Sequence, residues 1–507
     1  MVKILRQKET FCLFLIIFLA FILRVYGLKW DGNFHLHPDE RMLVMVTEKI
    51  SLPKFSDWKL IFTPQSPLNP QFFAYGSLPI YLLKFFSWLT ALFLGDKWML
   101  YAYLPLVGRI MAILFDLGSV FIVYRLGRKI WGGRVGLMGA FFYATCVLPI
   151  QLSHFFTVDI PLNFFILLTL YRLLIFYDHP DFKNGLLVGA TFGLSLATKA
   201  SATLLIFSIG AAFFADLFLV FLKFLRENKK SWRNKLLLFF KGFRNFFWQE
   251  YLLRTIAYFS TIVMATLIIY LIAQPYTFID FQTFWRQIKE QNQMTYNAYV
   301  FPYTLQFVGT IPYWYQLKNM VLWGMGIGLG LLSLAGTIWY LADLTKRLFI
   351  KGDYDQEAKE LILIIFWFAY FLAVGKFAVK FMRYFLPLYP IFILMGARFL
   401  DRQGAKFKGL VSGFLILIHF VWVFAFVSIY SRPHSRVEAS DWINENIPAG
   451  SVLAVEHWDD RLPLFGMEKY QFVEMPMYDS DESFLKWKMV ETNLAKANYI
   501  ILASNRL

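Results

Sequence analysis

The chain has 507 residues, of which 58% are hydrophobic and 20% aromatic, and its net charge is +16. Soluble globular chains are usually about half apolar, so this composition excludes an ordinary soluble domain. The charge would suit a nucleic-acid-binding protein, but lysine and arginine lie in short segments between long apolar blocks, as in the cytoplasmic loops of membrane proteins. We therefore predict an α-helical polytopic membrane protein with no nucleic-acid partner.

The apolar blocks have the length of roughly 20 residues that crosses a bilayer. The first block follows Lys3, Arg6 and Lys8 and contains no small-residue cleavage site, so we interpret it as an uncleaved span with a cytoplasmic N-terminus. We predict about 11 spans in all. They are placed at 10–28, 104–125, 135–153, 160–177, 185–200, 202–222, 253–274, 317–342, 361–377, 383–400 and 409–430.

Alternation of these spans puts every group of basic residues on the cytoplasmic side, in agreement with the positive-inside rule. The segments 29–103, 275–316 and 431–507 then lie outside. The apolar run 78–94 is expected to be re-entrant or interfacial, because a span there would move the basic loops outside. The basic groups are Arg125, Arg128, Lys129 and Arg134; Lys223 through Arg254; Lys346, Arg347 and Lys351; and Arg402, Lys406 and Lys408.

Two outer segments have their own predicted structure. Residues 280–293 carry apolar side chains at helical spacing and polar ones opposite, which is typical of an amphipathic helix on the membrane surface. In 431–507 a strand is predicted at 451–456, a helix at 483–497 and a second strand at 498–503. We expect a transmembrane domain over 1–430 and a small extracytoplasmic α/β domain over 431–507, truncated because the chain stops after a strand.

Cys12 and Cys146 both fall in predicted spans and give neither a disulfide framework nor a zinc pattern. His35 and His37 form a His-x-His pair with only nearby acids to complete a metal shell, so a divalent metal is not favoured. Asp479-Ser480-Asp481 mimics a metal motif of nucleotide-sugar enzymes, but a solvated turn is the preferred interpretation. No cofactor is expected.

Two acidic sites lie at predicted outer ends of spans. Asp39 and Glu40 follow His37-Pro38 after the first span, and Asp159 enters the fourth span. Each acid would also be favourable simply as part of a helix N-terminus. Because the topology brings these acids to one face of the membrane, we expect them to share a cavity.

Cations also lie on the outer side, against the general charge trend. Lys199 ends the fifth span, and Lys376, Lys380, Arg383 and Tyr384 cluster between the ninth and tenth spans. They either reach to lipid headgroups or bind a phosphate. Acids and cations on one face fit a transfer in which a carboxylate accepts a proton from an acceptor hydroxyl attacking a sugar carbon. The cations would stabilise a lipid phosphate as it leaves, without a metal.

Three short motifs, His37–Glu40, Phe156–Asp159 and Arg383–Pro387, resemble those of the GT-C superfamily. The most similar members are protein mannosyltransferases that use dolichyl- or polyprenyl-phosphate mannose, with the aminoarabinose transferases as relatives. The resemblance extends over residues 10–430 in topology. It implies a GT-C fold, a polyprenyl-phosphate donor of a mannose-like sugar, and inversion at the sugar carbon.

The resemblance also implies roles for individual residues. Asp39 would be the catalytic base and Asp159 a second acid near the donor or acceptor, while Lys199, Lys380 and Arg383 would hold phosphate. Further candidates, which sit beside these motifs, are Glu40 as a catalytic acid and His37, Tyr75, His154 and Tyr384 as substrate-binding residues.

One segment departs from the family pattern. Tyr75–Pro79 stands where aminoarabinose transferases have a Lys-Pro-Pro motif, but only one proline matches and the lysine is missing. Trp458-Asp459-Asp460 could hold a sugar, although a surface loop is the preferred interpretation.

We therefore predict a multi-pass plasma-membrane glycosyltransferase that transfers a sugar from a polyprenyl-phosphate donor to an acceptor hydroxyl of a protein, lipid or glycan on the outer face. One alternative is a ligase or polymerase that moves a larger lipid-linked glycan. Another is a transporter or flippase, although transporters often contain repeated halves and this chain shows none.

Overall fold

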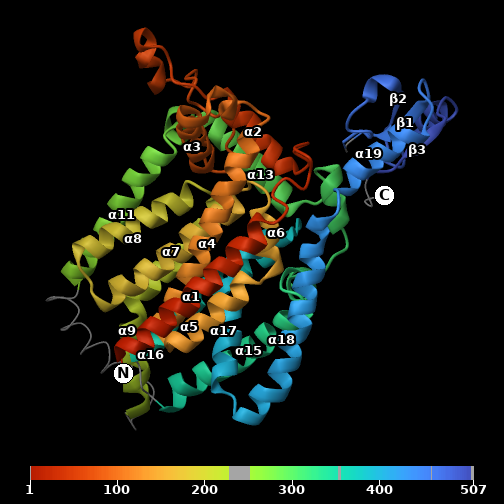
Figure 1. Cartoon of the computed structure of the whole chain (residues 1–507). Helices are drawn as coiled ribbons and strands as arrows, with labels where there is room; N and C mark the ends of the chain where they lie inside the picture. Colours follow the sequence, from red (N-terminus) through yellow and green to blue (C-terminus); the bar gives the residue numbers. More distant parts are fainter. Residues whose placement is uncertain (1, 228–251, 352–354, 458–459, 504–507) are drawn as a thin grey trace.

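The computed structural model describes residues 2–227, 252–351, 355–457 and 460–503. Long helices lie side by side in a bundle, with the N-terminus at one end and the C-terminal strands beyond the other (Figure 1). The long helices are α1 (Val2–Val25), α4 (Leu104–Trp131), α5 (Gly133–Ala144), α7 (Asp159–Asp178), α8 (Phe182–Leu196), α9 (Leu205–Glu227), α11 (Leu252–Ala273), α15 (Ile327–Lys346), α16 (Asp355–Gly375), α17 (Tyr389–Arg402) and α18 (Ala405–Val427).

Seven helices of the described chain are long and apolar enough to cross a membrane. An eighth candidate is α5 together with α6 (Val147–Ser153), a pair bent by 55°. The prediction of a multi-pass membrane protein is confirmed, but the count of about 11 spans is not, because α8, for example, has only 15 residues. Most of the predicted basic loop 223–254 lies outside the described residues.

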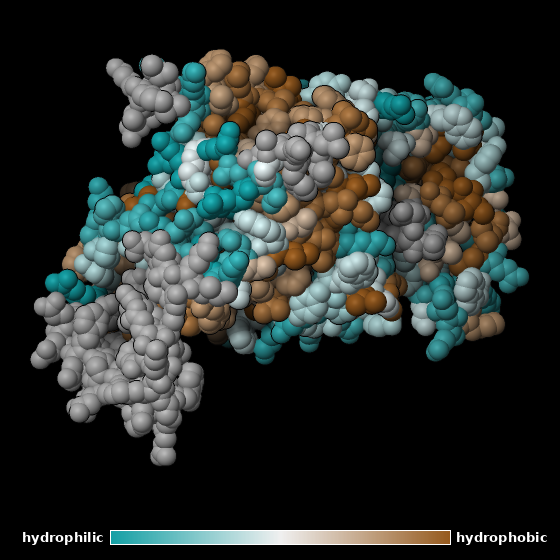
Figure 2. Space-filling model, turned by 90° about the horizontal axis from the view of Figure 1, so that it is seen from below, coloured by the Kyte–Doolittle hydropathy of each residue, from teal (hydrophilic) through white to brown (hydrophobic). Residues whose placement is uncertain are grey.

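The surface of the bundle is apolar, as expected for contact with lipid tails. Phe11 is 62% exposed, Ile272 71% and Phe424 66%. From below, hydrophobic side chains form broad patches between hydrophilic ones (Figure 2). Inside the bundle, α8 and α11 approach closely: a Cβ on Gly189 would lie 2.4 Å from the Ile262 carbonyl oxygen. Small residues commonly allow such contacts between membrane helices.

The segment between α1 and α4 forms helices α2 (Pro38–Lys49) and α3 (Leu78–Leu94), with a 3₁₀ helix at Phe55–Phe62 between them. Helix α13 (Phe281–Tyr296) confirms the predicted helix over 280–293. These helices gather at the end of the bundle opposite the N-terminus, which is called the α2 end below (Figure 1). At 17 residues α3 falls short of a full span, in keeping with an interfacial or re-entrant helix.

Beyond α18 the chain forms α19 (Ser435–Asn446) and a parallel sheet in the order β2-β1-β3, with Val452 opposite Gln471 and Leu453 opposite Tyr499. Strands β1 (Val452–Glu456) and β3 (Tyr499–Ile501) and helix α20 (Phe484–Leu494) were predicted; β2 (Gln471–Met475) was not. That residues 431–507 form a separate domain, and that they lie outside the membrane, stay predictions.

Candidate functional site

Four charged side chains from distant segments meet at the α2 end of the bundle. Asp39 lies in the first turn of α2, Asp159 begins α7, Lys199 follows α8, and Arg383 lies in a 3₁₀ helix at Met382–Leu388. An Arg383 Nη atom is 2.9 Å from an Asp39 carboxylate oxygen, and its Nε is 3.6 Å from Asp159. Lys199 Nζ donates to Asp159 at 2.8 Å. Two of the predicted acids, Asp39 and Asp159, and two of the predicted substrate-binding residues, Lys199 and Arg383, therefore share one site, called the acid–cation cluster below.

The two acids differ in access to solvent. The Asp39 side chain is 19% exposed, whereas that of Asp159 is 3% exposed and contacts two cations. Both acids lie in the first turn of a helix, where the helix dipole favours negative charge. Asp39 is therefore the carboxylate that an incoming molecule can reach, and Asp159 is placed to hold Lys199 and Arg383.

Asp39 is ionised at neutral pH. Burial alone would raise its pKa, but the charges of Arg383, His37 and Lys199 and a hydrogen bond from the Tyr75 hydroxyl outweigh burial and lower the pKa. Burial lowers the pKa of the neighbouring His37 to about 4, so that imidazole is neutral and lies 4.6 Å from the Phe155 ring. Because His37 is neutral at neutral pH, Arg383 and Lys199 are the cations that keep Asp39 ionised and able to accept a proton.

Aromatic rings surround the two cations. Lys199 Nζ lies 4.7 Å from the Tyr384 ring centroid and 5.8 Å from that of Tyr75, and the Arg383 guanidinium lies 4.3 Å from that of Phe381. Such cation–π contacts hold a cation in place while its N–H groups stay free to bind other groups. Tyr303 was not predicted from the sequence. Burial raises the pKa of Tyr303, and the nearby charge of Asp39 raises it further.

Residues Tyr75–Pro79, which depart from the family motif, still contribute to this site. The Gly76 N–H donates to the Thr198 carbonyl at 3.0 Å, and that of Leu78 donates to Ala197 at 3.1 Å. A Cβ on Gly76 would lie 1.9 Å from the Ala197 carbonyl oxygen, so only glycine fits this close approach. The contact places Tyr75 beside Lys199, which supports the prediction that Tyr75 belongs to the site.

Glu40 lies next to Asp39 in the chain but faces the bundle interior. Its carboxylate is fully buried and accepts from Arg109 at 2.9 and 2.6 Å and from the Phe156 N–H at 2.9 Å. Arg109 also donates to Asp31 at 2.7 and 3.0 Å. Glu40 is thus occupied by structural contacts. Arg109 was missed, although an arginine at the end of a membrane helix is itself a signal.

Two further candidates lie apart from the acid–cation cluster. The His154 ring stacks on Tyr430 at 3.8 Å, and its Nε2 is 2.9 Å from the Tyr26 carbonyl oxygen, so it joins the ends of α1 and α18. Lys380 is buried and donates to the Ala378 carbonyl at 2.8 Å. Burial lowers the pKa of Lys380, and within the described chain it has no ion pair.

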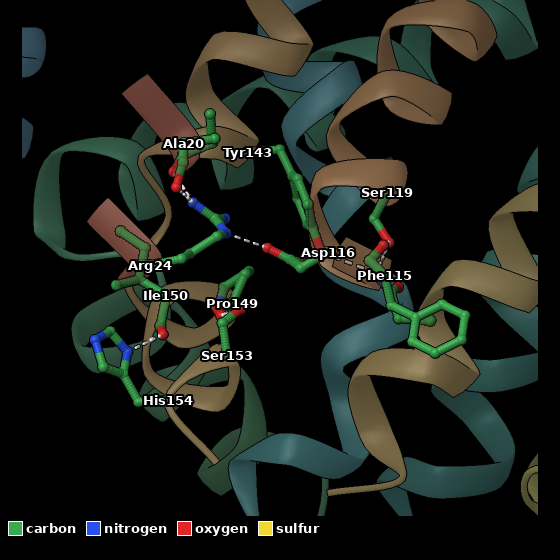
Figure 3. A network of polar contacts seen from close by, with 12 residues as sticks. Ala20, Arg24, Phe115, Asp116, Ser119, Tyr143, Pro149, Ile150, Ser153 and His154 are labelled. Atoms are coloured by element: carbon green, nitrogen blue, oxygen red, sulfur yellow. Dashed lines mark hydrogen bonds and ion pairs between the residues drawn. The ribbon is translucent and has the colours of Figure 1, made fainter. Parts of the chain in front are cut away.

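A second buried polar network lies between α1, α4 and α5 (Figure 3). Arg24 and Asp116 are fully buried and 2.5 Å apart. Tyr143 donates to Asp116 at 2.7 Å, and Arg24 donates to the Ala144 carbonyl at 2.8 Å. Charges inside a membrane protein need such partners. This network was not predicted from the sequence. It joins α1 to the rest of the bundle.

Within the described chain no group of three or more His, Cys, Asp or Glu side chains is arranged to hold a metal ion. The absence of a cofactor stays a prediction. Of the discounted motifs, Trp458 and Asp459 lie outside the described residues, and Asp481 pairs with Lys486.

The structure therefore defines a helical membrane protein with a charged site at one end of its bundle. Residues 85–242, less than half of the chain, match the family model described as dolichyl-phosphate-mannose-protein mannosyltransferase. No curated protein gives a significant match.

Solved structures share the fold at low identity. The oligosaccharyltransferase of Archaeoglobus fulgidus in its apo form is 14% identical, with a TM-score of 0.53, and the match covers 97% of this chain and 69% of that chain. AglB of the same organism, in complex with an inhibitory peptide and a dolichol-phosphate, is 13% identical with a TM-score of 0.53, covering 98% and 69%. ArnT from Cupriavidus metallidurans, bound to undecaprenyl phosphate, is 14% identical with a TM-score of 0.47, covering 96% and 89%. The solved oligosaccharyltransferase structures show that this chain shares their fold, and part of the chain resembles the mannosyltransferase family.

Proposed function

We propose that this protein transfers a mannose-like hexose from a polyprenyl-phosphate donor to an acceptor hydroxyl on the outer face of the membrane, with Asp39 as the base. The observation that carries the proposal is the reachable, ionised Asp39 carboxylate held beside two cations. A dolichol-phosphate is bound in the structure of AglB, whose fold this chain shares. The acceptor is a hydroxyl of a protein, a lipid or a glycan.

The reaction follows from the charges in the cluster. Asp39 accepts the proton of the acceptor hydroxyl as its oxygen forms a bond to the anomeric carbon. The bond from that carbon to the phosphate oxygen breaks, and the polyprenyl phosphate leaves with the electron pair. Attack opposite the leaving group inverts the sugar carbon. Arg383 and Lys199 stabilise the phosphate charge, and Asp159 orients both cations.

The test is a transfer assay on purified protein in lipid with radiolabelled polyprenyl-phosphate mannose. Release of polyprenyl phosphate is expected in EDTA as well as without it. Asp39→Asn should lower turnover by about 10²–10⁴-fold, the usual contribution of a general base, and still bind the donor. The matched control is Asp57→Asn, an exposed acid on the 3₁₀ helix after α2, which should transfer at the normal rate.

The remaining outcomes separate the rivals. Transport of the lipid-linked sugar that needs Asp39, with no release of polyprenyl phosphate from any lipid-phosphate sugar, would establish a flippase. Transfer only from a donor that carries a preassembled glycan would establish a ligase or polymerase. Transfer that EDTA abolishes would contradict the metal-independent reaction.

A further inference from the structure

The C-terminal part of the chain contacts the helix that carries Asp39. Two residues after Asp39, the Arg41 Nη atoms donate to both carboxylate oxygens of Asp460, at 2.7 and 2.9 Å. Asp460 lies between β1 and β2, 419 residues further along the chain. A two-bond contact between a planar guanidinium and a carboxylate sets orientation as well as distance. The pair therefore limits the rotation of α2 relative to the C-terminal region.

Asp460 is itself held by a second cation. Arg436, near the start of α19, donates to Asp460 at 2.8 Å. The side chains of Arg41, Asp460 and Arg436 are 33%, 22% and 21% exposed, so water reaches them only in part. Networks with this geometry contribute more than an isolated exposed pair.

Other contacts dock the same two regions. Before α2, the Trp30 indole N–H donates to the Arg432 carbonyl at 2.9 Å, and the Trp30 ring meets Tyr430 edge-on at 5.2 Å. The rings of Phe34 and Phe465 stack at 5.8 Å. The C-terminal region is thus attached both to the segment that leads into α2 and to the first turn of α2.

Three consecutive side chains of α2 point to three different partners, because successive residues of an α-helix are about 100° apart. Asp39 faces the acid–cation cluster, Glu40 is held by Arg109 in the bundle, and Arg41 is held by Asp460. All three side chains make ion pairs, and the pairs of Glu40 and Arg41 set the rotation of α2 that presents Asp39 to Arg383. Releasing Arg41 would remove the contact between α2 and the C-terminal region and allow Asp39 to shift relative to Arg383.

We propose that Asp460 is a positioning residue for sugar transfer: through Arg41 it orients the helix that places the Asp39 carboxylate against the acceptor. In this proposal Asp460 acts through its contact with Arg41 and not by binding donor or acceptor. The inference rests on the proposed function, because Asp39 must be the base for its orientation to govern turnover. A misplacement of about 1 Å at a reacting group can cost up to about 10²-fold in rate.

The experiment is a double-mutant cycle in the transfer assay with the full chain in lipid. Arg41→Gln and Asp460→Asn should each lower kcat about tenfold, with the KM values for donor and acceptor within about twofold of wild type. The double variant should also lose about tenfold and not about a hundredfold, because both changes break one contact. Arg41→Lys, which keeps the charge but not the two-bond geometry, should fall between wild type and Arg41→Gln.

The pH profile separates positioning from general destabilisation. Loosening the Asp39–Arg383 contact raises the pKa of Asp39, so the acid limb of kcat should move to higher pH in both single variants. The matched control is Arg461→Gln, which removes a pair with Glu474 inside the C-terminal region and should leave kcat and the limb unchanged.

The failures of the two proposals are distinguishable. If the proposed function is wrong, wild type releases no polyprenyl phosphate or Asp39→Asn is fully active. If only the positioning inference is wrong, wild type is active and needs Asp39, but the single variants keep kcat or their losses multiply. A raised acceptor KM at unchanged kcat would instead make Asp460 an acceptor contact. Should Asp460→Asn not fold, Arg41→Lys alone decides, since unchanged kcat in that variant overturns the inference.

Discussion

Replacing Glu40 by glutamine should destabilise the fold and leave the donor site in place. The change keeps the side-chain shape and removes the charge that meets Arg109. Glu40 accepts three hydrogen bonds, two from Arg109 and one from the Phe156 N–H, and no part of it is exposed. It therefore links α2 to α4 and to the turn before α7.

The size of the loss follows from these contacts. Breaking a buried ion pair costs about 3–5 kcal/mol, and a hydrogen bond to a charged group contributes about 1.5–3 kcal/mol. Asp31 keeps its two bonds to Arg109, so the guanidinium is not left unpaired. The glutamine carbonyl also keeps one acceptor oxygen. We expect the free energy of unfolding to fall by about 3 kcal/mol, the lower end of that range.

The assay is equilibrium unfolding in mixed micelles titrated with a denaturing detergent, followed by donor binding on the folded variant. The control is Glu290→Gln on α13, whose exposed carboxylate only reaches Arg286 at 4.0 Å, and which should unfold like wild type. Donor affinity should stay within about twofold, because Glu40 faces away from the acid–cation cluster. Wild-type stability with abolished transfer would refute this reasoning and make Glu40 part of the reaction.

Three further outcomes follow from the site and the bundle. Since nearby cations lower the pKa of Asp39, protonation of Asp39 should slow transfer only below the usual pKa of an aspartate, and Arg383→Gln should move that limb of the pH–rate profile to higher pH. Gly76→Ala puts a Cβ 1.9 Å from a backbone carbonyl and should lower kcat at least about tenfold, with α-helical circular dichroism unchanged. Asp116→Asn leaves Arg24 as an unpaired buried charge and should lower the free energy of unfolding by about 3 kcal/mol or more in the detergent titration.

The members of the site could be predicted because membrane topology is a strong constraint. Asp39, Asp159, Lys199 and Arg383 are far apart in the sequence, but the alternation of spans puts all four at one end of the bundle. Charged residues at span ends are few, so sidedness alone selects a small group. The same argument does not reach His154, which lies at that end of the bundle but packs against Tyr430.

What the sequence could not show depends on rotation about a helix axis. Asp39 and Glu40 are adjacent acids after a proline, and nothing local says which one faces the site. The difference arises because Arg109, on α4, is placed to take Glu40. The span count is not confirmed, because several apolar helices of the described chain are short or bent, and length alone does not separate a full crossing from a partial one.

The charges of the cluster lead to one last prediction. Two acids and two cations balance one another there, so a donor phosphate adds a negative charge that the cluster itself does not offset. Lys380, three residues before Arg383, has no ion pair within the described chain and can supply the missing charge. Lys380→Gln should weaken donor binding about tenfold at low salt, with a smaller effect at high salt, measured by equilibrium binding of labelled donor. Unchanged donor affinity of Lys380→Gln would mean that the phosphate pairs with Arg383 in place of Asp39. Donor binding would then raise the pKa of Asp39.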